Sequence, residues 1–322
     1  MNRWFRIAVS GVLVTGLILR TDWAQVGEAF ASLRLQWWWA AFLLYLVSQL
    51  VSAVRWQLLA RPLGFKESLA RFVSFYFIGM YFNMLLPTSV GGDVLRAWYL
   101  DGGSGRRLAA FVSVFADRFS GLLVLLALAC AAVVFCPLEL PRWVPASVWG
   151  TASCALAGLA VAPLLARGKG RGPWTLRLTA AGRAFRRQPR LLLITTALSL
   201  VVQAANVAIV WFIGLGLGLK VPPAYYAIMV PMVSLLTLLP ISINGIGVRE
   251  EGMMRFLAFL GVPTGTTLCL SLLWFAVFLA AGGLGGLVYL LGSFPRPEVT
   301  TGHEPVCGDP HQGRARQLTT AA

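Results

Sequence analysis

Two matching stretches decide the fold of this chain. They read LLPTSVGGDVLR, from Leu85 to Arg96, and LLPISINGIGVR, from Leu238 to Arg249. The copies align without a gap and share six of their twelve residues. Each puts a helix-breaking proline and a glycine into an otherwise apolar segment and ends in an arginine. Broken apolar segments at matching places in two halves are typical of a transporter's binding site. The alternative is an old duplication whose Pro and Gly residues only shape two loops.

The composition excludes an ordinary soluble protein. Of the 322 residues, 58% are hydrophobic and 12% are charged, and the mean hydropathy is +0.75. A soluble core cannot bury that much apolar surface, so the sequence predicts a polytopic membrane protein. The net charge of +15 could indicate nucleic-acid binding. However, the basic residues lie in short loops between apolar runs, where they are typical of topology signals.

Full membrane spans are predicted wherever about 20 mostly apolar residues follow one another. They lie near 5–20, 37–59, 108–136, 146–166, 191–213 and 266–291. The first has the basic flank of a secretory signal peptide, but no small-x-small cleavage site follows Leu19, which favours an uncleaved signal anchor. After Gly292 the chain turns polar, which predicts a membrane domain over 1–291 and a disordered cytoplasmic tail over 292–322.

The orientation follows from the loop at 167–190, which holds eight basic residues and no acidic one and is therefore expected to be cytoplasmic. The membrane is expected to be the inner (plasma) membrane, and the N-terminus and the loop with Arg106 and Arg107 are then also cytoplasmic. This topology is consistent only if the segments 72–90 and 225–245 dip into the membrane and return to the side they entered. The predicted fold is therefore an all-α polytopic membrane protein with about six full spans and two re-entrant broken helices, related as an inverted repeat whose motifs meet near the middle.

Charges inside the apolar runs are candidate functional groups because they are costly there. Asp117 and Arg118 lie about three turns into the span 108–136. Adjacent side chains on a helix point about 100° apart, so each must find its partner elsewhere. The candidate partners are Arg55, Arg96, Arg249, Glu250 and Glu251. An interhelical salt bridge and a role in the substrate path both remain open for Asp117 and Arg118. Arg55 either snorkels to lipid headgroups or contacts the substrate.

Arg96 and Arg249 indicate a phosphate site, because each ends a glycine-containing break where a new helix could begin. Free N–H groups at a helix start, together with a guanidinium fork, suit a phosphate. The sequence has no nucleotide-binding, zinc-protease or nucleophile-elbow motif and no CxxC pair. Its only histidines, His303 and His311, lie in the tail, where a metal site of Cys307 and His311 is the weaker alternative to disorder. No cofactor or metal is expected.

Four blocks resemble the lysylphosphatidylglycerol synthase transmembrane-domain family, also described as flippase-like membrane proteins. They are VRWQLL (54–59), NMLLPTSVGGDVLRAWYL (83–100), ADRFSGL (116–122) and SINGIGVREEG (242–252). The resemblance implies a lipid-handling protein, similar to the membrane half of the bacterial multiple peptide resistance factor, which moves an aminoacylated phosphatidylglycerol between leaflets. No aminoacyltransferase domain follows the last span, so we expect no lysyl-lipid synthesis. The resemblance does not specify which lipid is the substrate.

The leading hypothesis is a lipid flippase or transporter whose partners are anionic membrane lipids, not nucleic acid. Asp93, Asp117 and Glu250 would balance charge or mediate proton coupling. The alternatives are an intramembrane transferase, with Asp93 or Glu250 as general base, and a non-catalytic partner of a separate lipid synthase. The candidate substrate-binding residues are Arg55, Asn83, Pro87, Ser89, Gly91, Gly92, Asp93, Arg96, Asp117, Arg118, Pro240, Ser242, Asn244, Gly245, Gly247, Arg249 and Glu250.

Overall fold

The computed structural model divides into two compact units, Met1–Leu291 and Gly292–Ala322. The structure describes residues 11–12, 15–19, 21–86, 91–165, 182, 185, 188–238, 242, 245–292 and 294. All elements named below belong to the first unit. The expected tail, 292–322, lies almost wholly outside the described residues.

The described residues form helices and no strand. Five helices are long and apolar enough to cross a membrane: α3 (Leu35–Ala60, extended to Leu63 by the 3-10 turn η1, Arg61–Leu63), α6 (Arg107–Phe135), α7 (Trp143–Leu165), α9 (Pro189–Gly216) and α12 (Thr264–Leu291). They confirm five of the six predicted spans within a few residues at each end. The sixth, 5–20, lies largely outside the described residues.

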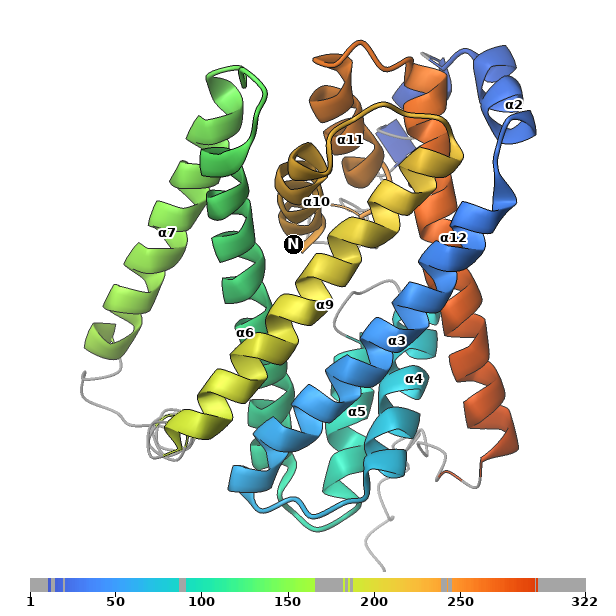
Figure 1. Cartoon of the computed structure of the whole chain (residues 1–322). Helices are drawn as coiled ribbons and strands as arrows, with labels where there is room; N and C mark the ends of the chain where they lie inside the picture. Colours follow the sequence, from blue (N-terminus) through green and yellow to red (C-terminus); the bar gives the residue numbers. More distant parts are fainter. Residues whose placement is uncertain are drawn as a thin grey trace, which may run out of the picture. The chain divides into compact units, whose positions relative to one another are not determined.

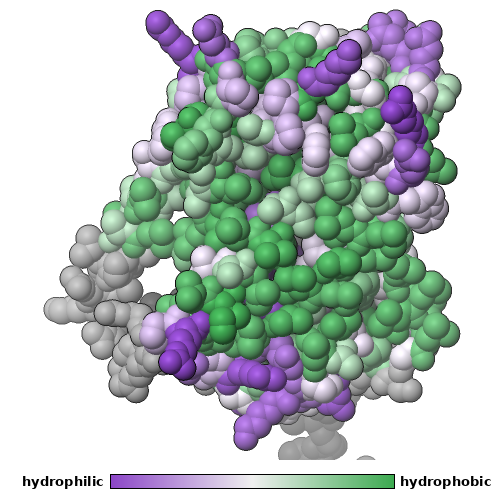
Figure 2. All heavy atoms as spheres, in the orientation of Figure 1, coloured by the Kyte–Doolittle hydropathy of each residue, from purple (hydrophilic) through white to green (hydrophobic). Residues whose placement is uncertain are grey.

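The surface of the first unit has the distribution expected in a bilayer. Figure 2 shows an apolar belt around the middle, with hydrophilic residues gathered at the two ends. Large apolar side chains face outward, among them Leu193, which is 73% exposed. Because no soluble protein leaves so much apolar surface uncovered, the chain is an all-α polytopic membrane protein.

Two helical hairpins occupy the places of the two sequence motifs. The first consists of α4 (Leu69–Leu85) and α5 (Gly91–Asp101), and the second of α10 (Pro223–Leu238) and α11 (Val248–Ala258). Within each hairpin the two helices pack against each other. Figure 1 shows that α4 and α5 both lie toward the end where α6 begins, whereas α10 and α11 lie toward the opposite end. Each hairpin thus returns to the end it came from, as expected of re-entrant segments.

The repeat is larger than the motif that revealed it. The offset of 153 that joins Leu85 to Leu238 also brings the start of α3 to within one residue of the start of α9, and the start of α6 to within four residues of that of α12. Each half is therefore a long helix, a hairpin and a second long helix. Only α7 and the short α2 (Trp23–Ala31) stand outside this scheme among the labelled helices.

The packing repeats with the sequence. Helix α3 packs along α9, its counterpart, and this contact is the most extensive between any two helices. Each hairpin packs against a long helix of the other half: α4 packs on α12, and α10 packs on α6. Small residues make the α4–α12 contact possible, because a Cβ on Gly285 would overlap the carbonyl of Phe77.

The interior has an apolar and a polar region. The apolar core lies mainly among α9, α10, α11 and α12, with Ile213, Met229, Met253 and Cys269 fully buried. Buried polar and charged side chains instead gather where α3, α6 and α9 meet. Most of the buried charge therefore lies beside the first hairpin, and Arg249 and Glu250 of the second hairpin carry the rest.

Candidate functional site

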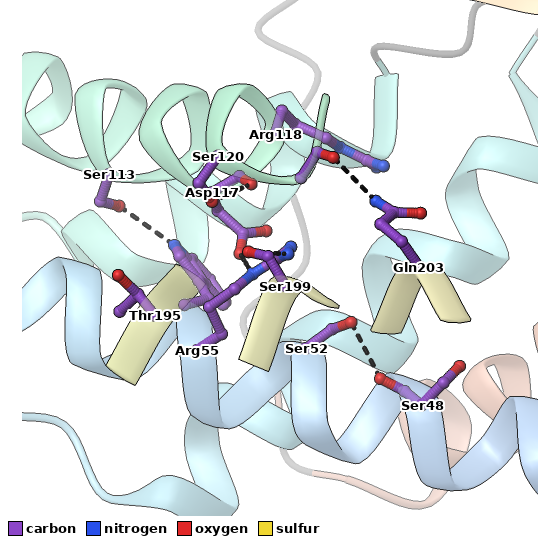
Figure 3. A network of polar contacts seen from close by, with 12 residues as sticks. Ser48, Ser52, Arg55, Ser113, Asp117, Arg118, Ser120, Thr195, Ser199 and Gln203 are labelled. Atoms are coloured by element: carbon purple, nitrogen blue, oxygen red, sulfur yellow. Dashed lines mark hydrogen bonds and ion pairs between the residues drawn. The ribbon is translucent and has the colours of Figure 1, made fainter. Parts of the chain in front are cut away.

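A chain of ion pairs joins the first hairpin to two long helices. Its centre is Asp117 on α6, whose side chain is wholly buried. Arg55 on α3 donates from Nε to Asp117 Oδ1 at 2.9 Å, and Arg96 on α5 donates from Nη2 to Asp117 Oδ2 at 3.2 Å. Figure 3 shows Arg55 and Asp117 pointing toward each other from their helices. Two of the partners predicted for Asp117 are thereby confirmed.

Asp93 on α5 continues the chain. Its Oδ1 accepts from Arg96 Nη1 at 3.2 Å and from Arg118 Nη2 at 2.9 Å, while its Oδ2 accepts from Arg118 Nε at 2.8 Å. Asp117 and Arg118 thus have separate partners, as predicted, but Asp93 was not among the partners predicted from the sequence. Arg118 pairs with Asp93 because α5 packs along α6 after the hairpin turns back. The order of contacts is Arg55, Asp117, Arg96, Asp93, Arg118, which we call the arginine chain.

Arg96 is the most enclosed of the three arginines in the arginine chain. Its guanidinium carbon lies 4.2 Å from the centre of the Trp56 ring and 4.1 Å from that of Tyr76. A cation between aromatic faces is stabilised by their quadrupoles. The methylene stem of Arg96 lies against Gly79, where any Cβ would come within 2.7 Å of it. The Nε of Arg96 has no hydrogen-bond partner. Arg96 therefore holds the hairpin in place from inside.

The two helices of the first hairpin meet at glycine. A Cβ on Gly92 would overlap the carbonyl of Gly79, so only glycine allows this approach. Next to it, the side-chain oxygen of Asn83 accepts from the Gly92 N–H at 2.8 Å. This bond satisfies one of the free N–H groups at the start of α5. Helix α5 therefore begins at Gly91, and Asn83 caps its first turn.

The second motif builds a smaller cluster at the start of α11. Arg249 donates from Nε to Glu250 Oε1 at 3.1 Å and to Ser271 Oγ at 3.0 Å. The other Glu250 oxygen, Oε2, accepts from the N–H of Gly247 at 2.7 Å and so caps the helix. Gly245 and Gly247 have φ of +76° and +86°, a region that favours glycine, so they shape the break itself. We call Arg249, Glu250 and Ser271 the second cluster.

A row of buried polar side chains escaped the sequence analysis. It lies between α3, α6 and α9 and joins the arginine chain, as Figure 3 shows: Ser48, Ser52, Ser113, Thr195, Ser199 and Gln203. Ser199 accepts from Arg55 Nη1 at 2.9 Å, and Gln203 donates to the carbonyl of Gly121 at 3.0 Å. The signal was available, since polar residues recur every fourth position along otherwise apolar helices and so share one face.

The predicted site residues thus separate into two groups. The first group lies in and beside the first hairpin and consists of Arg55, Asn83, Gly91, Gly92, Asp93, Arg96, Asp117 and Arg118. The second group lies at the second hairpin and consists of Gly245, Gly247, Arg249 and Glu250. Ser242 is buried and its hydroxyl has no hydrogen-bond partner. Pro87, Ser89, Pro240 and Asn244 lie outside the described residues, so the expected meeting of the two breaks is not described. Among the residues that the structure describes, no ion pair joins the two groups.

The chemistry of the arginine chain suits an anion. Three arginines face two aspartates, which leaves one positive charge in excess. The second cluster is neutral, with one arginine and one glutamate. The described residues hold no group of three or more His, Cys, Asp or Glu side chains that could bind a metal ion. Of the three arginines in the arginine chain, Arg118 alone keeps much of its side chain exposed, at 53%.

Comparison with known proteins gives one match. Residues 3–286 match the family model described as "Lysylphosphatidylglycerol synthase TM region". No curated protein matches the chain. No solved structure matches it either.

Proposed function

Because the chain belongs to the lysylphosphatidylglycerol synthase transmembrane-region family, we propose that it is a carrier that moves an anionic lipid between membrane leaflets. The lipid would be a phospholipid or an isoprenoid-phosphate-linked lipid. The observation that carries the proposal is the arginine chain: a positively charged cluster next to a broken helix, in a fold of two oppositely oriented repeats. Inverted repeats with broken helices are a common architecture of alternating-access carriers.

Arg118 is the proposed contact for the lipid phosphate. The guanidinium fork matches two phosphate oxygens, and Arg118 is half exposed, whereas Arg96 and Arg55 are 2% and 5% exposed at the side chain. Arg96 and Arg55 would hold Asp117 and the hairpin in place. Arg249 would play the same supporting part at the second hairpin, because its fork is already occupied by Glu250 and Ser271.

A carrier is favoured over a transferase. A general base needs a carboxylate that is free to accept a proton. Asp93 and Glu250, the two candidates for that role, both have their oxygens occupied by arginine or backbone donors. We therefore propose transport without chemical change of the lipid.

The proposed orientation puts the end where α3 finishes and α6 begins at the cytoplasmic side of the plasma membrane. Arg106 and Arg107 lie at this end, and α9 also begins there. Basic loops favour the cytoplasmic face. The first hairpin would then enter from the cytoplasm and the second from outside.

The test is lipid translocation by the purified protein in liposomes. Vesicles would carry a fluorescent phosphatidylglycerol or a fluorescent isoprenoid phosphate, and a membrane-impermeant reductant would report how much label reaches the outer leaflet. We expect the wild type to move one of these lipids and Arg118→Ala to slow this by at least about tenfold, since the phosphate loses its counter-charge. Arg118→Lys should keep part of the rate.

The matched control is Arg71→Ala. Arg71 is 65% exposed on α4 and pairs with Glu67 at the surface, so the change removes the same charge from the same half. Its rate should equal that of the wild type. No translocation of any anionic lipid by folded wild-type protein would exclude the carrier and favour the transferase or the partner of a separate synthase.

A further inference from the structure

The Arg118 guanidinium is already engaged in the way a phosphate would engage it. Two of its nitrogens, Nε and Nη2, donate to the two oxygens of Asp93 at 2.8 and 2.9 Å. This side-by-side geometry is the one in which arginine binds a phosphate. Asp93 therefore occupies the position that an anionic ligand of Arg118 would take.

Asp93 is not bound to Arg118 alone. Its Oδ1 also accepts from Arg96 Nη1 at 3.2 Å, and Arg96 lies behind it, sandwiched between two aromatic rings. If Arg118 turned to another anion, Asp93 would keep a buried cation as its partner. The exchange therefore leaves no carboxylate uncompensated, which is the usual obstacle to breaking a partly buried ion pair.

The charge of the arginine chain specifies the ligand. With Asp93 still present beside Arg96, the three arginines and two aspartates carry one net positive charge. A headgroup with one negative charge makes the cluster neutral. A headgroup does not need an ammonium group of its own to compensate Asp93, because Arg96 already does so.

From this geometry we propose that Asp93 is a built-in competitor for the anion site on Arg118, which a monoanionic phosphodiester headgroup displaces. The proposal rests on the proposed function, because it concerns the same arginine. It adds that the site is closed by the first hairpin itself, since Asp93 belongs to α5 and Arg118 to α6. Ligand binding then breaks one of the three ion-pair links between these helices, while the Arg96–Asp117 and Asp101–Arg107 pairs keep the others.

The experiment compares anion binding by Asp93→Asn and by charge-matched variants. The probe is dihexanoyl phosphatidylglycerol, titrated calorimetrically into the full-length protein in a non-ionic detergent. An asparagine cannot hold the arginine fork as an anion does, so Asp93→Asn should bind the probe about tenfold more tightly than the wild type. The double variant Asp93→Asn with Arg118→Ala should lose this gain.

The control is Asp117→Asn, which removes the same charge from the arginine chain but contacts Arg55 and Arg96 instead of Arg118. Where Asp117→Asn fails to fold, Asp101→Asn serves instead, because it removes a buried carboxylate from the far end of the same helix, α5. Equal tightening by Asp93→Asn and the control would reduce the effect to overall charge and overturn the proposal. No tightening by Asp93→Asn, or no binding by any variant, would overturn it as well.

The binding experiment tests the competitor separately from the transport activity. Tighter binding by Asp93→Asn in a protein that moves no lipid would support the competitor and reject the carrier. Translocation by the wild type, without tighter binding by Asp93→Asn, would support the carrier and reject the competitor.

Discussion

The two motif arginines occupy aligned positions in the sequence but different surroundings in the structure. Arg96 contacts Asp93 on its own helix, Asp117 on α6 and the rings of Trp56 and Tyr76. Arg249 contacts the next residue in the chain, Glu250, and on α12 one hydroxyl and the ring of Phe275. The first arginine ties a hairpin to two long helices, and the second ties a hairpin to one. After duplication, the halves kept the arginine and changed its counter-charges.

The glycines of the two copies show the same divergence. Gly92 and Gly245 are aligned, but they are needed for different reasons. Gly92 is inside a helix and lets α4 approach, whereas Gly245 has a φ of +76° and forms the break before α11. An identical residue in two repeats can therefore serve close packing in one and a backbone turn in the other. The identity in sequence reports common descent, and the structure is needed to assign the role.

The largest effect is expected at the centre of the arginine chain. Asp117→Ala would leave Arg55 and Arg96 buried with one anion fewer, and breaking such a buried pair costs about 3–5 kcal/mol. We expect a matching fall in the free energy of unfolding, measured by denaturation in detergent. Asp117→Asn should cost less because it keeps the shape and part of the hydrogen bonding. If both variants were as stable as the wild type, Asp117 would not be the centre of the cluster.

The second prediction separates the two motif arginines. Arg249→Ala would leave Glu250 charged and buried with only hydroxyl and backbone partners, which should cost about 3 kcal/mol of unfolding free energy. Adding Glu250→Gln should restore most of this loss, since the uncompensated charge is then gone. Arg96→Ala should gain nothing from Asp93→Asn, because Asp93 and Asp117 each keep another arginine. Equal rescue in the two copies would show that their clusters work alike.

The smallest effect is expected from a single methyl group. Gly92→Ala would push α5 away from the Gly79 carbonyl, and overpacking of this kind costs about 1–3 kcal/mol. The control is Gly150→Ala on α7, where a Cβ meets nothing within 4 Å, so stability should be unchanged or slightly higher. Thermal unfolding of the two variants side by side would measure the difference. A tolerated Gly92→Ala would mean that the first hairpin is packed less tightly than its geometry indicates.

The sequence predicted the long helices well, because span length and apolar composition are local properties that a bilayer imposes directly. The repeat was also visible, since a proline, two leucines and an arginine recur at one offset. The pairing of Arg118 with Asp93 was not, because it depends on α5 folding back beside α6. Nor did two matching stretches of twelve residues, with six identities, reveal that four helices repeat. At this offset, equivalent positions in α3 and α9 have at most apolar character in common, apart from Val54 and Val207, and many residues satisfy that property.

The exchange of hairpins between the halves has a consequence for biosynthesis. Because α4 packs on α12, the surface that covers the first hairpin emerges from the ribosome only after α6, α7, α9, α10 and α11. The first half cannot reach its final packing when it is inserted, and must wait in the membrane until α12 has been made. Truncation before α12 should therefore leave an inserted but unfinished protein, with α4 open to lipid or to the quality-control machinery that removes such intermediates.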